Sequence, residues 1–247
     1  MSDRPSFIDQ LPPWPEGDFS AFGEITETRL SRIQALTGSF MSRNWLTIPH
    51  VTHHDDVDTT ALEDFRKGLD TRVSPLAFII KAVISGLKAF PHFNASLDAS
   101  GRNLILKQYF HIGVAIDTPN GLLVGVVRDC DRKSPVELAA EIADLSARAR
   151  EKGLSMAEMS GGCMTVSSLG GIGGTGFTPI INAPEVAILG VTRSEWKPAR
   201  GENGELIWRH KTPFSLSYDH RVINGADAAR FVRHLDEVMA APAGLID

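Results

Sequence analysis

The sequence contains almost no cysteine: Cys130 and Cys163 are the only two in 247 residues. Two thiols are too few for the disulfide framework of a small secreted protein, and too few for a zinc site made of cysteines alone. The start, MSDRPSFIDQ, has no basic segment followed by an apolar one, so no secretory signal is visible. These absences predict a cytoplasmic protein with two reduced thiols.

A long apolar run and a dense basic run are also missing. No stretch approaches the roughly 18 apolar residues of a membrane-spanning helix, which predicts no membrane association. The chain has 25 Lys and Arg against 30 Asp and Glu, a formal net charge of -5, and its most basic stretch is interrupted by Asp129 and Asp131. Proteins that bind nucleic acid usually carry a basic patch or stripe, so we predict no nucleic-acid partner.

The remaining composition, 43% hydrophobic and 22% charged, is that of an ordinary globular protein. Residues 1–22 alternate prolines with aromatic residues, which disfavours a helix and predicts an ordered extended arm. These positions are Pro5, Phe7, Pro12, Pro13, Trp14, Pro15, Phe19 and Phe22. No repeat or internal linker follows, so residues 23–247 are predicted to form one domain.

Helix and strand signals alternate irregularly along that domain. Helices are predicted at 29–44, 59–67 (with Thr59 or Thr60 as its cap), 74–89, 134–152 and 225–239. Strands are predicted at 50–58, 94–97, 104–107, 111–116, 122–127, 163–167, 186–192, 196–199, 206–210 and 214–218. Because two turns, around residues 120 and 203, indicate hairpins, the predicted class is α/β in the loose sense, a mixed β-sheet flanked by helices.

Two patterns suggest ligands, but their context argues against each. Residues 171–176 satisfy G-x-G-x-x-G, yet Pro179 and Pro184 follow where a dinucleotide site needs a helix. A tight loop that closely approaches another chain or a ligand is the better prediction. The second pattern is a group of potential metal ligands, but strand neighbours such as His53 and His54 point to opposite faces, so no metal site is predicted. The group comprises His50, His53, His54, Asp55 and Asp56.

The segment Ser217–Gly225, SYDHRVING, places His220 at the end of a β-rich run. Strand ends and loops are where catalytic side chains often lie. A lone histidine is more often structural, and no G-x-S-x-G elbow accompanies it. These residues alone therefore make His220 a candidate without deciding its role.

Residues 217–231 resemble the signature of the acyltransferase component of 2-oxoacid dehydrogenase complexes, whose His-x-x-x-Asp-Gly core is shared with chloramphenicol acetyltransferases. Further stretches agree in order, at 45–51, 93–96, 111–124, 165–174 and 182–190. The resemblance implies a chloramphenicol-acetyltransferase-like fold with a strand-containing trimer interface. The ending at 226–231 looks most like the acetyl-transferring type of the pyruvate dehydrogenase complex, with succinyl and branched-chain acyl donors as the open alternatives.

The family's activity is the transfer of an acyl group between dihydrolipoamide and coenzyme A. A thiol with a pKa near 8.5 must lose its proton to attack a thioester, and the resemblance makes His220 the general base that accepts it. The implied oxyanion donor is the Ser167 hydroxyl. Asn224 stands where many members have Asp, and a neutral amide can orient the base but cannot stabilise an imidazolium by charge.

The resemblance also implies ligands and partners. Acetyl-CoA or coenzyme A would be the substrate, with Arg43, Ser168 and Thr192 as binding candidates, and the lipoyl group would come from a separate domain or chain. No metal is implied. The family forms homotrimers in which His220 meets Ser167 of a neighbour, and Leu245-Ile246 could build a larger cage. Lipoyl domains and the other enzymes of a 2-oxoacid dehydrogenase complex would be its partners.

Two other functions stay open at this point. One is an acetyl-CoA-dependent acetyltransferase that acts on a small alcohol or amine, and the other is a non-catalytic structural core subunit. The sequence departs from the family at Gly125, where relatives commonly have Pro, and in the short link 68–73.

Overall fold

The structure is a computed structural model that describes residues 12–246. Residues 1–11, including Pro5 and Phe7 of the predicted arm, and residue 247 lie outside the described part. The chain divides into two units, Met1–Ser31 and Arg32–Asp247, whereas the sequence places the end of the arm at residue 22. In the first unit, a short 3-10 helix, η2 (Phe19–Phe22), starts where Asp18 accepts a hydrogen bond from the Ser20 amide at 3.1 Å.

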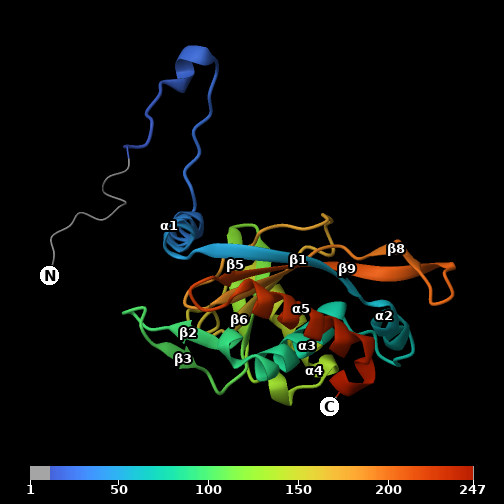
Figure 1. Cartoon of the computed structure of the whole chain (residues 1–247). Coiled ribbons are helices and arrows are strands. Elements are labelled where there is room, and N and C mark those ends of the chain that lie inside the picture. The colour runs from blue at the N-terminus through green and yellow to red at the C-terminus, as the bar shows by residue number, and fades with distance from the viewer. Residues whose placement is uncertain (1–11, 247) are drawn as a thin grey trace. The chain divides into compact units, whose positions relative to one another are not determined.

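Seven strands of the second unit form one mixed sheet, and two short strands form a separate hairpin (Figure 1). The large sheet contains β1 (His50–Asp58), β4 (Ile112–Thr118), β5 (Gly121–Val127), β6 (Met164–Ser168), β7 (Ala187–Val191), β8 (Glu195–Arg200) and β9 (Leu206–Asp219). The hairpin consists of β2 (Ala95–Leu97) and β3 (Leu104–Leu106). The order is β1-β9-β7-β6-β4-β5, with β8 paired to β9. Only β4–β6 and β6–β7 are parallel, so the predicted mixed sheet is confirmed.

Five helices accompany the sheet: α1 (Arg32–Thr47), α2 (Thr60–Lys67), α3 (Pro75–Ala89), α4 (Pro135–Lys152) and α5 (Gly225–Ala240). The Ser-Pro starts are confirmed, because Ser74 caps α3 and Ser134 forms a capping box with Glu137 in α4. Short 3-10 turns lie at η3 (Pro91–Phe93), η4 (Cys130–Arg132) and η5 (Pro242–Leu245). α1 begins three residues later than predicted, since apolar spacing alone does not fix a helix end.

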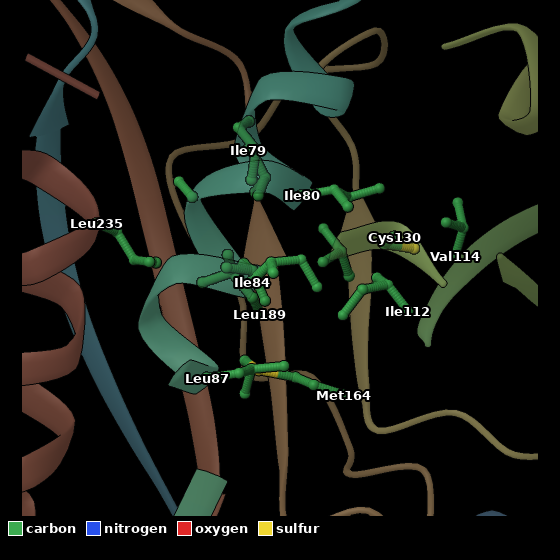
Figure 2. Close-up of a cluster of buried hydrophobic side chains, with 14 of the residues drawn as sticks. Ile79, Ile80, Ile84, Leu87, Ile112, Val114, Cys130, Met164, Leu189 and Leu235 are labelled. Atoms are coloured by element: carbon green, nitrogen blue, oxygen red, sulfur yellow. The ribbon is translucent and has the colours of Figure 1, made fainter. Parts of the chain in front are cut away.

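The main hydrophobic core lies between the sheet and helices α3, α4 and α5, with α3 at its centre (Figure 2). Ile80 and Leu87 of α3 are buried together with Ile112 of β4, Met164 of β6 and Leu189 of β7. Each such side chain contributes about 1.5–3 kcal/mol when it is fully buried. The core therefore fixes the strands whose ends carry the candidate residues.

The opposite face of the sheet is covered by an irregular segment, residues 169–186, instead of helices. Ile181 of this segment packs on Ile48 and Ile188 in a second, smaller core. The Phe177 ring lies directly over Gly190, where an added Cβ would be only 2.8 Å from it. The segment after Gly176 is not helical. The glycines at 171–176 therefore do not open the helix that a dinucleotide site requires.

Strand β9 corrects one prediction, because the two strands predicted at 206–210 and 214–218 are one strand that includes Pro213. In a strand, the backbone N and C=O of one residue point toward the same neighbouring strand. At Pro213 that neighbour would be β7, but β7 ends at Val191, which pairs with Phe214. Thr192 donates its amide to the Pro213 carbonyl at 3.2 Å. The missing N–H of the proline therefore breaks no ladder bond.

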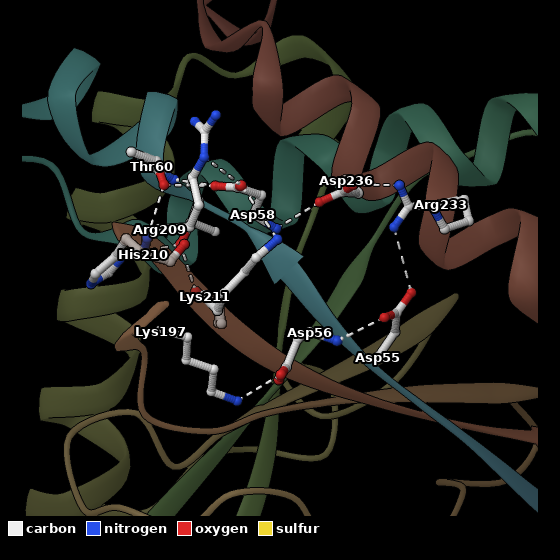
Figure 3. Close-up of polar contacts among 12 residues, drawn as sticks. Asp55, Asp56, Asp58, Thr60, Lys197, Arg209, His210, Lys211, Arg233 and Asp236 are labelled. Atoms are coloured by element: carbon white, nitrogen blue, oxygen red, sulfur yellow. Dashed lines mark hydrogen bonds and ion pairs between the residues drawn. The ribbon is translucent and has the colours of Figure 1, made fainter. Parts of the chain in front are cut away.

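A network of ion pairs joins the far ends of β1 and β9 to α5 (Figure 3). Thr59 is the N-cap of α2, as one of the two predicted positions, but its side chain makes no cap hydrogen bond. The Asp58 carboxylate instead accepts from the Thr60 amide at 3.0 Å and from the Thr60 hydroxyl at 2.7 Å. Burial alone would raise the pKa of Asp58, but these hydrogen bonds and the Lys211 ammonium lower it on balance. The two aspartates of the group of potential metal ligands form ion pairs here as well, Asp55 with Arg233 at 3.7 Å and Asp56 with Lys197 at 2.6 Å.

Candidate active site

His220 is the first residue after β9, and its backbone is held on two sides. Asp219 donates its amide to the Val186 carbonyl at 2.8 Å, and His220 donates its own to the Pro49 carbonyl at 3.0 Å. The imidazole itself is exposed. Within residues 12–246 it forms no hydrogen bond, and its ring lies 5.8 Å from that of Tyr218. A rigid strand end thus presents a histidine whose nitrogens remain free to act on another molecule.

The turn after β9 is locked by the buried carboxylate of Asp219. Its oxygens accept from the Arg221 amide at 3.0 Å and from Nε and Nη2 of the same guanidinium at 2.9 and 2.6 Å. This pairing raises the pKa of Arg221. Because the aspartate is occupied by Arg221, it fixes the loop instead of binding the imidazole.

Ser167 lies far from His220 in the same chain. The sheet aligns Ser167 with Gly190 of β7, and Gly190 with Ser215 of β9. His220 follows Ser215 by five residues, about 16 Å along the strand at roughly 3.3 Å per residue. Within a single chain the two side chains therefore cannot both act on the same reacting atom.

Asn224 stands at the amino end of α5, where it is the N-cap. Its Oδ1 accepts from the Asp227 amide at 2.9 Å, and its Nδ2 donates to the Asp227 carboxylate at 2.7 Å. Among the described residues, no hydrogen bond joins its side chain to His220. Its predicted role in orienting the base thus stays a prediction, while its role as a helix cap is visible.

The coenzyme A candidates do not all lie together. Ser168 pairs in register with Val191, so Ser168 and Thr192 are neighbours of Ser167 at one end of the sheet. The Thr192 hydroxyl is buried, and among residues 12–246 it has no hydrogen-bond partner. Arg43, by contrast, is exposed at the end of α1 and donates two hydrogen bonds to the Asn44 Oδ1, at 3.1 and 2.8 Å.

Asn44 connects Arg43 to the His220 end of the sheet through a contact that sequence reasoning missed. Its Nδ2 donates to the Ile181 carbonyl at 2.9 Å, and the Ile181 amide donates to His50 Nε2 at 3.0 Å. Because His50 Nδ1 lies 2.8 Å from the Ile48 carbonyl, the ring is a neutral Nδ1–H tautomer. His50, one of the potential metal ligands in the sequence, instead has a structural role, because its ring fixes the backbone of Ile181 near the His220 end of the sheet.

Glu185 is a buried acidic residue that the residue pattern did not single out. Its buried carboxyl accepts from the Thr165 hydroxyl at 2.7 Å and from Asn182 Nδ2 at 3.3 Å. Burial raises the pKa of Glu185 to about 7, although these hydrogen bonds and the Lys107 charge oppose the rise. In the sequence, residues 182–190 stood out only through their resemblance to the family. In the structure this stretch contains a buried acid, Glu185, next to Val186, whose carbonyl accepts the Asp219 amide.

Other chemistry finds little support in the described part of the chain. Burial raises the pKa of Cys130 to about 12 and also raises that of Cys163, so neither thiol is an activated nucleophile. No group of three His, Cys, Asp or Glu within residues 12–246 is arranged to hold a metal ion. No helix in the same range is long and apolar enough to span a bilayer.

Residues 22–246 match the family model described as "2-oxoacid dehydrogenases acyltransferase (catalytic domain)". The chain belongs to this acyltransferase family. It is 51% identical over 240 residues to the dihydrolipoyllysine-residue acetyltransferase component of the pyruvate dehydrogenase complex of Haemophilus influenzae. That match covers 93% of this acyltransferase chain but only 42% of the relative, so the chain spans less than half the length of that protein.

Solved structures agree with the family. The acyltransferase chain superposes with a TM-score of 0.91 on the dihydrolipoamide acetyltransferase of Azotobacter vinelandii, 45% identical, covering 96% of this chain and 100% of that one. That structure comes from work on the role of a serine, a histidine and an asparagine in its catalytic mechanism. A second structure, the cubic core of a pyruvate dehydrogenase complex, is 46% identical with a TM-score of 0.91, covering 96% of this chain and 100% of that one.

The predicted fold type is confirmed by a more distant likeness. A chloramphenicol acetyltransferase superposes on the acyltransferase chain with a TM-score of 0.55 at 16% identity, covering 81% of this chain and 94% of that one. At that identity the likeness concerns the fold alone.

Proposed function

We propose that residues 23–247 form the catalytic domain of a dihydrolipoamide acetyltransferase that moves an acetyl group between dihydrolipoamide and coenzyme A. The observation that carries this proposal is the separation of the candidates into two groups. His220, Asn224 and Arg43 belong to one end of the sheet, and Ser167, Ser168 and Thr192 belong to the other. A complete site then requires the two ends to meet, and two copies of the chain can bring them together.

The proposed assembly is a homotrimer in which His220 of one copy faces Ser167 of the next. Each half-site fits this arrangement, since His220 is exposed and Ser167 is half-buried at a strand end. A head-to-tail interface that closes after three copies gives three identical sites. The free imidazole nitrogens of His220 would then find their partners only in the assembled protein.

His220 accepts the proton of the attacking thiol, and the thiolate adds to the thioester carbonyl. The carbonyl oxygen becomes an oxyanion, which accepts a hydrogen bond from the Ser167 hydroxyl of the neighbouring copy. When the intermediate collapses, the carbon–sulfur bond to the leaving thiol breaks, and the leaving sulfur takes the proton back from His220. The same groups serve both directions of transfer.

Coenzyme A contacts are proposed at Arg43, Ser168 and Thr192. The Arg43 guanidinium suits a phosphate, although in the free chain it already binds Asn44 and lies 5.3 Å from the centre of the Phe40 ring. The buried Thr192 hydroxyl without a partner is a polar group that a ligand could satisfy. No metal takes part in the proposed reaction.

The wider assembly is also proposed by analogy with the relatives. We propose that the lipoyl group arrives on a separate domain or chain, that the other enzymes of a pyruvate dehydrogenase complex are partners, and that the protein works in the cytoplasm. The likeness to a cubic core supports a cage. Leu245 is buried in its own chain at 3% exposure, so of the predicted pair Leu245-Ile246 only Ile246, at 42%, can reach another trimer.

The test is steady-state acetyl transfer from acetyl-CoA to dihydrolipoamide by the assembled protein and by its His220→Ala variant. Losing a general base should lower the rate on the order of a hundredfold to ten-thousandfold. His53→Ala is the matched control, because His53 is a half-buried histidine within β1, away from the strand end. It should keep the parent rate.

Two results would contradict the proposal. A parent that forms trimers yet transfers acetyl to chloramphenicol and not to dihydrolipoamide would indicate a small-molecule acetyltransferase. A parent inactive toward both acceptors would indicate a structural core subunit.

A further inference from the structure

The backbone of His220 is held by the part of the chain that leads from α1 into β1. His220 donates its N–H to the Pro49 carbonyl at 3.0 Å, and the next residue, His50, pairs in register with Asp219. Because the His220 imidazole forms no hydrogen bond within residues 12–246, its position depends on this backbone. A contact that fixes Pro49 therefore also fixes the proposed base.

The His50 ring binds a backbone group with each of its two nitrogens. Nδ1 donates to the Ile48 carbonyl at 2.8 Å, and Nε2 accepts the Ile181 amide at 3.0 Å. The first bond lies directly beside Pro49, while the second reaches the segment that covers the sheet. Ile181 is fully buried and packs on Ile48 in the smaller core, so it is a rigid support. The ring therefore connects the residues around the Pro49 carbonyl to a fixed part of the fold.

Asn44, in the last turn of α1, holds the other polar group of Ile181. Its Nδ2 donates to the Ile181 carbonyl at 2.9 Å, and its Oδ1 accepts from the Arg43 guanidinium at 3.1 and 2.8 Å. The guanidinium must face the amide oxygen, so these bonds determine which way the Asn44 amide points. Asn44 is only 1% exposed, and losing its bond would leave the buried Ile181 carbonyl without this partner. Asn44 and His50 thus hold Ile181 from the two ends of the α1–β1 connection.

These two bonds are not what keeps β1 in the sheet. β1 pairs with β9 along its whole length, from His50 to Asp58, and packs against α5. Residues 48–49, which precede the strand, belong to no helix or strand. Losing a bond to Ile181 should therefore leave the fold in place and loosen the point to which the His220 amide is attached.

We propose that His50 is a positioning residue for acetyl transfer, with Asn44 as its counterpart on Ile181. The two side chains fix the Pro49 carbonyl and, through the amide of His220, the direction in which the imidazole points. The inference rests on the proposed reaction, in which a displacement of the base by about 1 Å can lower the rate about a hundredfold. His50 acts through the backbone, so its loss lowers kcat and leaves substrate binding unchanged.

The test compares His50→Asn with His50→Gln in steady-state acetyl transfer from acetyl-CoA to dihydrolipoamide by the assembled protein. The asparagine amide can still donate to the Ile48 carbonyl but is too short to reach Ile181, whereas the longer glutamine amide can accept the Ile181 N–H. His50→Asn should lower kcat about tenfold to a hundredfold, while KM for both substrates stays within about twofold. His50→Gln should keep kcat within about threefold of the parent.

Asn44→Ala tests the same support from its other side. If both side chains act through Ile181, the double variant His50→Asn/Asn44→Ala should have the kcat of the less active single variant within about threefold. Independent effects would instead multiply. His53→Asn is the matched control, because His53 is a half-buried histidine of the same strand, and it should keep the parent kcat.

Thermal unfolding and gel filtration of every variant show whether the assembly stays folded. A purely structural role would lower the melting temperature of His50→Asn and leave the kcat of its folded assembly unchanged, which would overturn the proposal. The proposal is also overturned if His50→Gln loses as much kcat as His50→Asn. Should His50→Asn fail to assemble, a parent kcat in Asn44→Ala would overturn it equally. An inactive parent would overturn the proposed acetyl transfer itself, whereas an active parent with unchanged variants would overturn only the role of His50.

Discussion

Ser167 and His220 of one chain lie at opposite ends of the same sheet. Ser167 is level with Ser215, and His220 follows Ser215 by five residues along β9. The general base and the oxyanion donor of the proposed reaction therefore belong to different copies. This separation makes the activity a property of the assembly, and it leads directly to a test by mixing variants.

Subunit mixing should restore activity to two inactive variants. His220→Ala should lose on the order of a hundredfold to ten-thousandfold, and Ser167→Ala about a hundredfold to a thousandfold. When both are coexpressed with different tags, random trimers combine an intact His220 with an intact neighbouring Ser167 at about a quarter of the sites. Each isolated mixed trimer has one such site among its three, so the mixed trimers should recover about a third of the parent activity in the acetyl-transfer assay. Recovery would be absent if both groups acted within one chain.

Glu185→Gln should flatten the pH dependence of stability. The pKa of Glu185 is raised by burial from 4.5 to about 7, so the folded protein binds more protons than the unfolded chain between these values. Stability from this group is therefore present at low pH and falls as pH rises from about 4.5 to 7, by about 3 kcal/mol in total. Urea unfolding at pH 5 and pH 8 measures the difference.

The glutamine variant should lose most of that pH-dependent difference, because it cannot ionise. Glu151→Gln on the exposed surface of α4 is the control, and its unfolding should follow the parent at both pH values. Equal pH dependence in the parent and in Glu185→Gln would show that Glu185 is not the titrating group.

Gly125→Ala should destabilise the fold without changing the chemistry. A Cβ at this position would come within 2.7 Å of Leu145 and 3.0 Å of Leu154, so both side chains must shift. Overpacking of this kind costs about 1–3 kcal/mol, and each kcal/mol lowers the melting temperature of a chain of this size by about 2–4 °C. Calorimetry measures the shift, and kcat should stay at the parent value.

Gly38→Ala is the control, and we expect it to raise the stability of the fold instead of lowering it. Nothing lies within 4 Å of an added Cβ at Gly38 in α1, and alanine is favoured over glycine in a helix by about 1 kcal/mol. If Gly125→Ala melted at the same temperature as the parent, the space next to Leu145 would be larger than the structure shows.

Local chemistry determined much of this protein from the sequence alone. The Ser-Pro starts of α3 and α4, the hairpin between β4 and β5 and the strand His50–Asp58 were all predicted, because caps, turns and alternation act within a few residues. The motif around His220 was predicted at a strand end, which the structure confirms. Periodicity could not fix helix ends, and the two strands predicted at 206–210 and 214–218 are one strand, β9, which includes Pro213 at a point where β7 has already ended.

Only the tertiary structure decided what depends on neighbours distant in the chain. Strand order separates Ser167 from His220, and no spacing in the sequence measures that distance. The Glu185 carboxyl, the His50 clamp on Ile181 and the Asn224–Asp227 pair acquire their roles from burial and from hydrogen bonds at fixed geometry. Sequence specifies which groups are available, and the packed sheet determines which of them meet, because side-chain interactions fall off within a few ångströms.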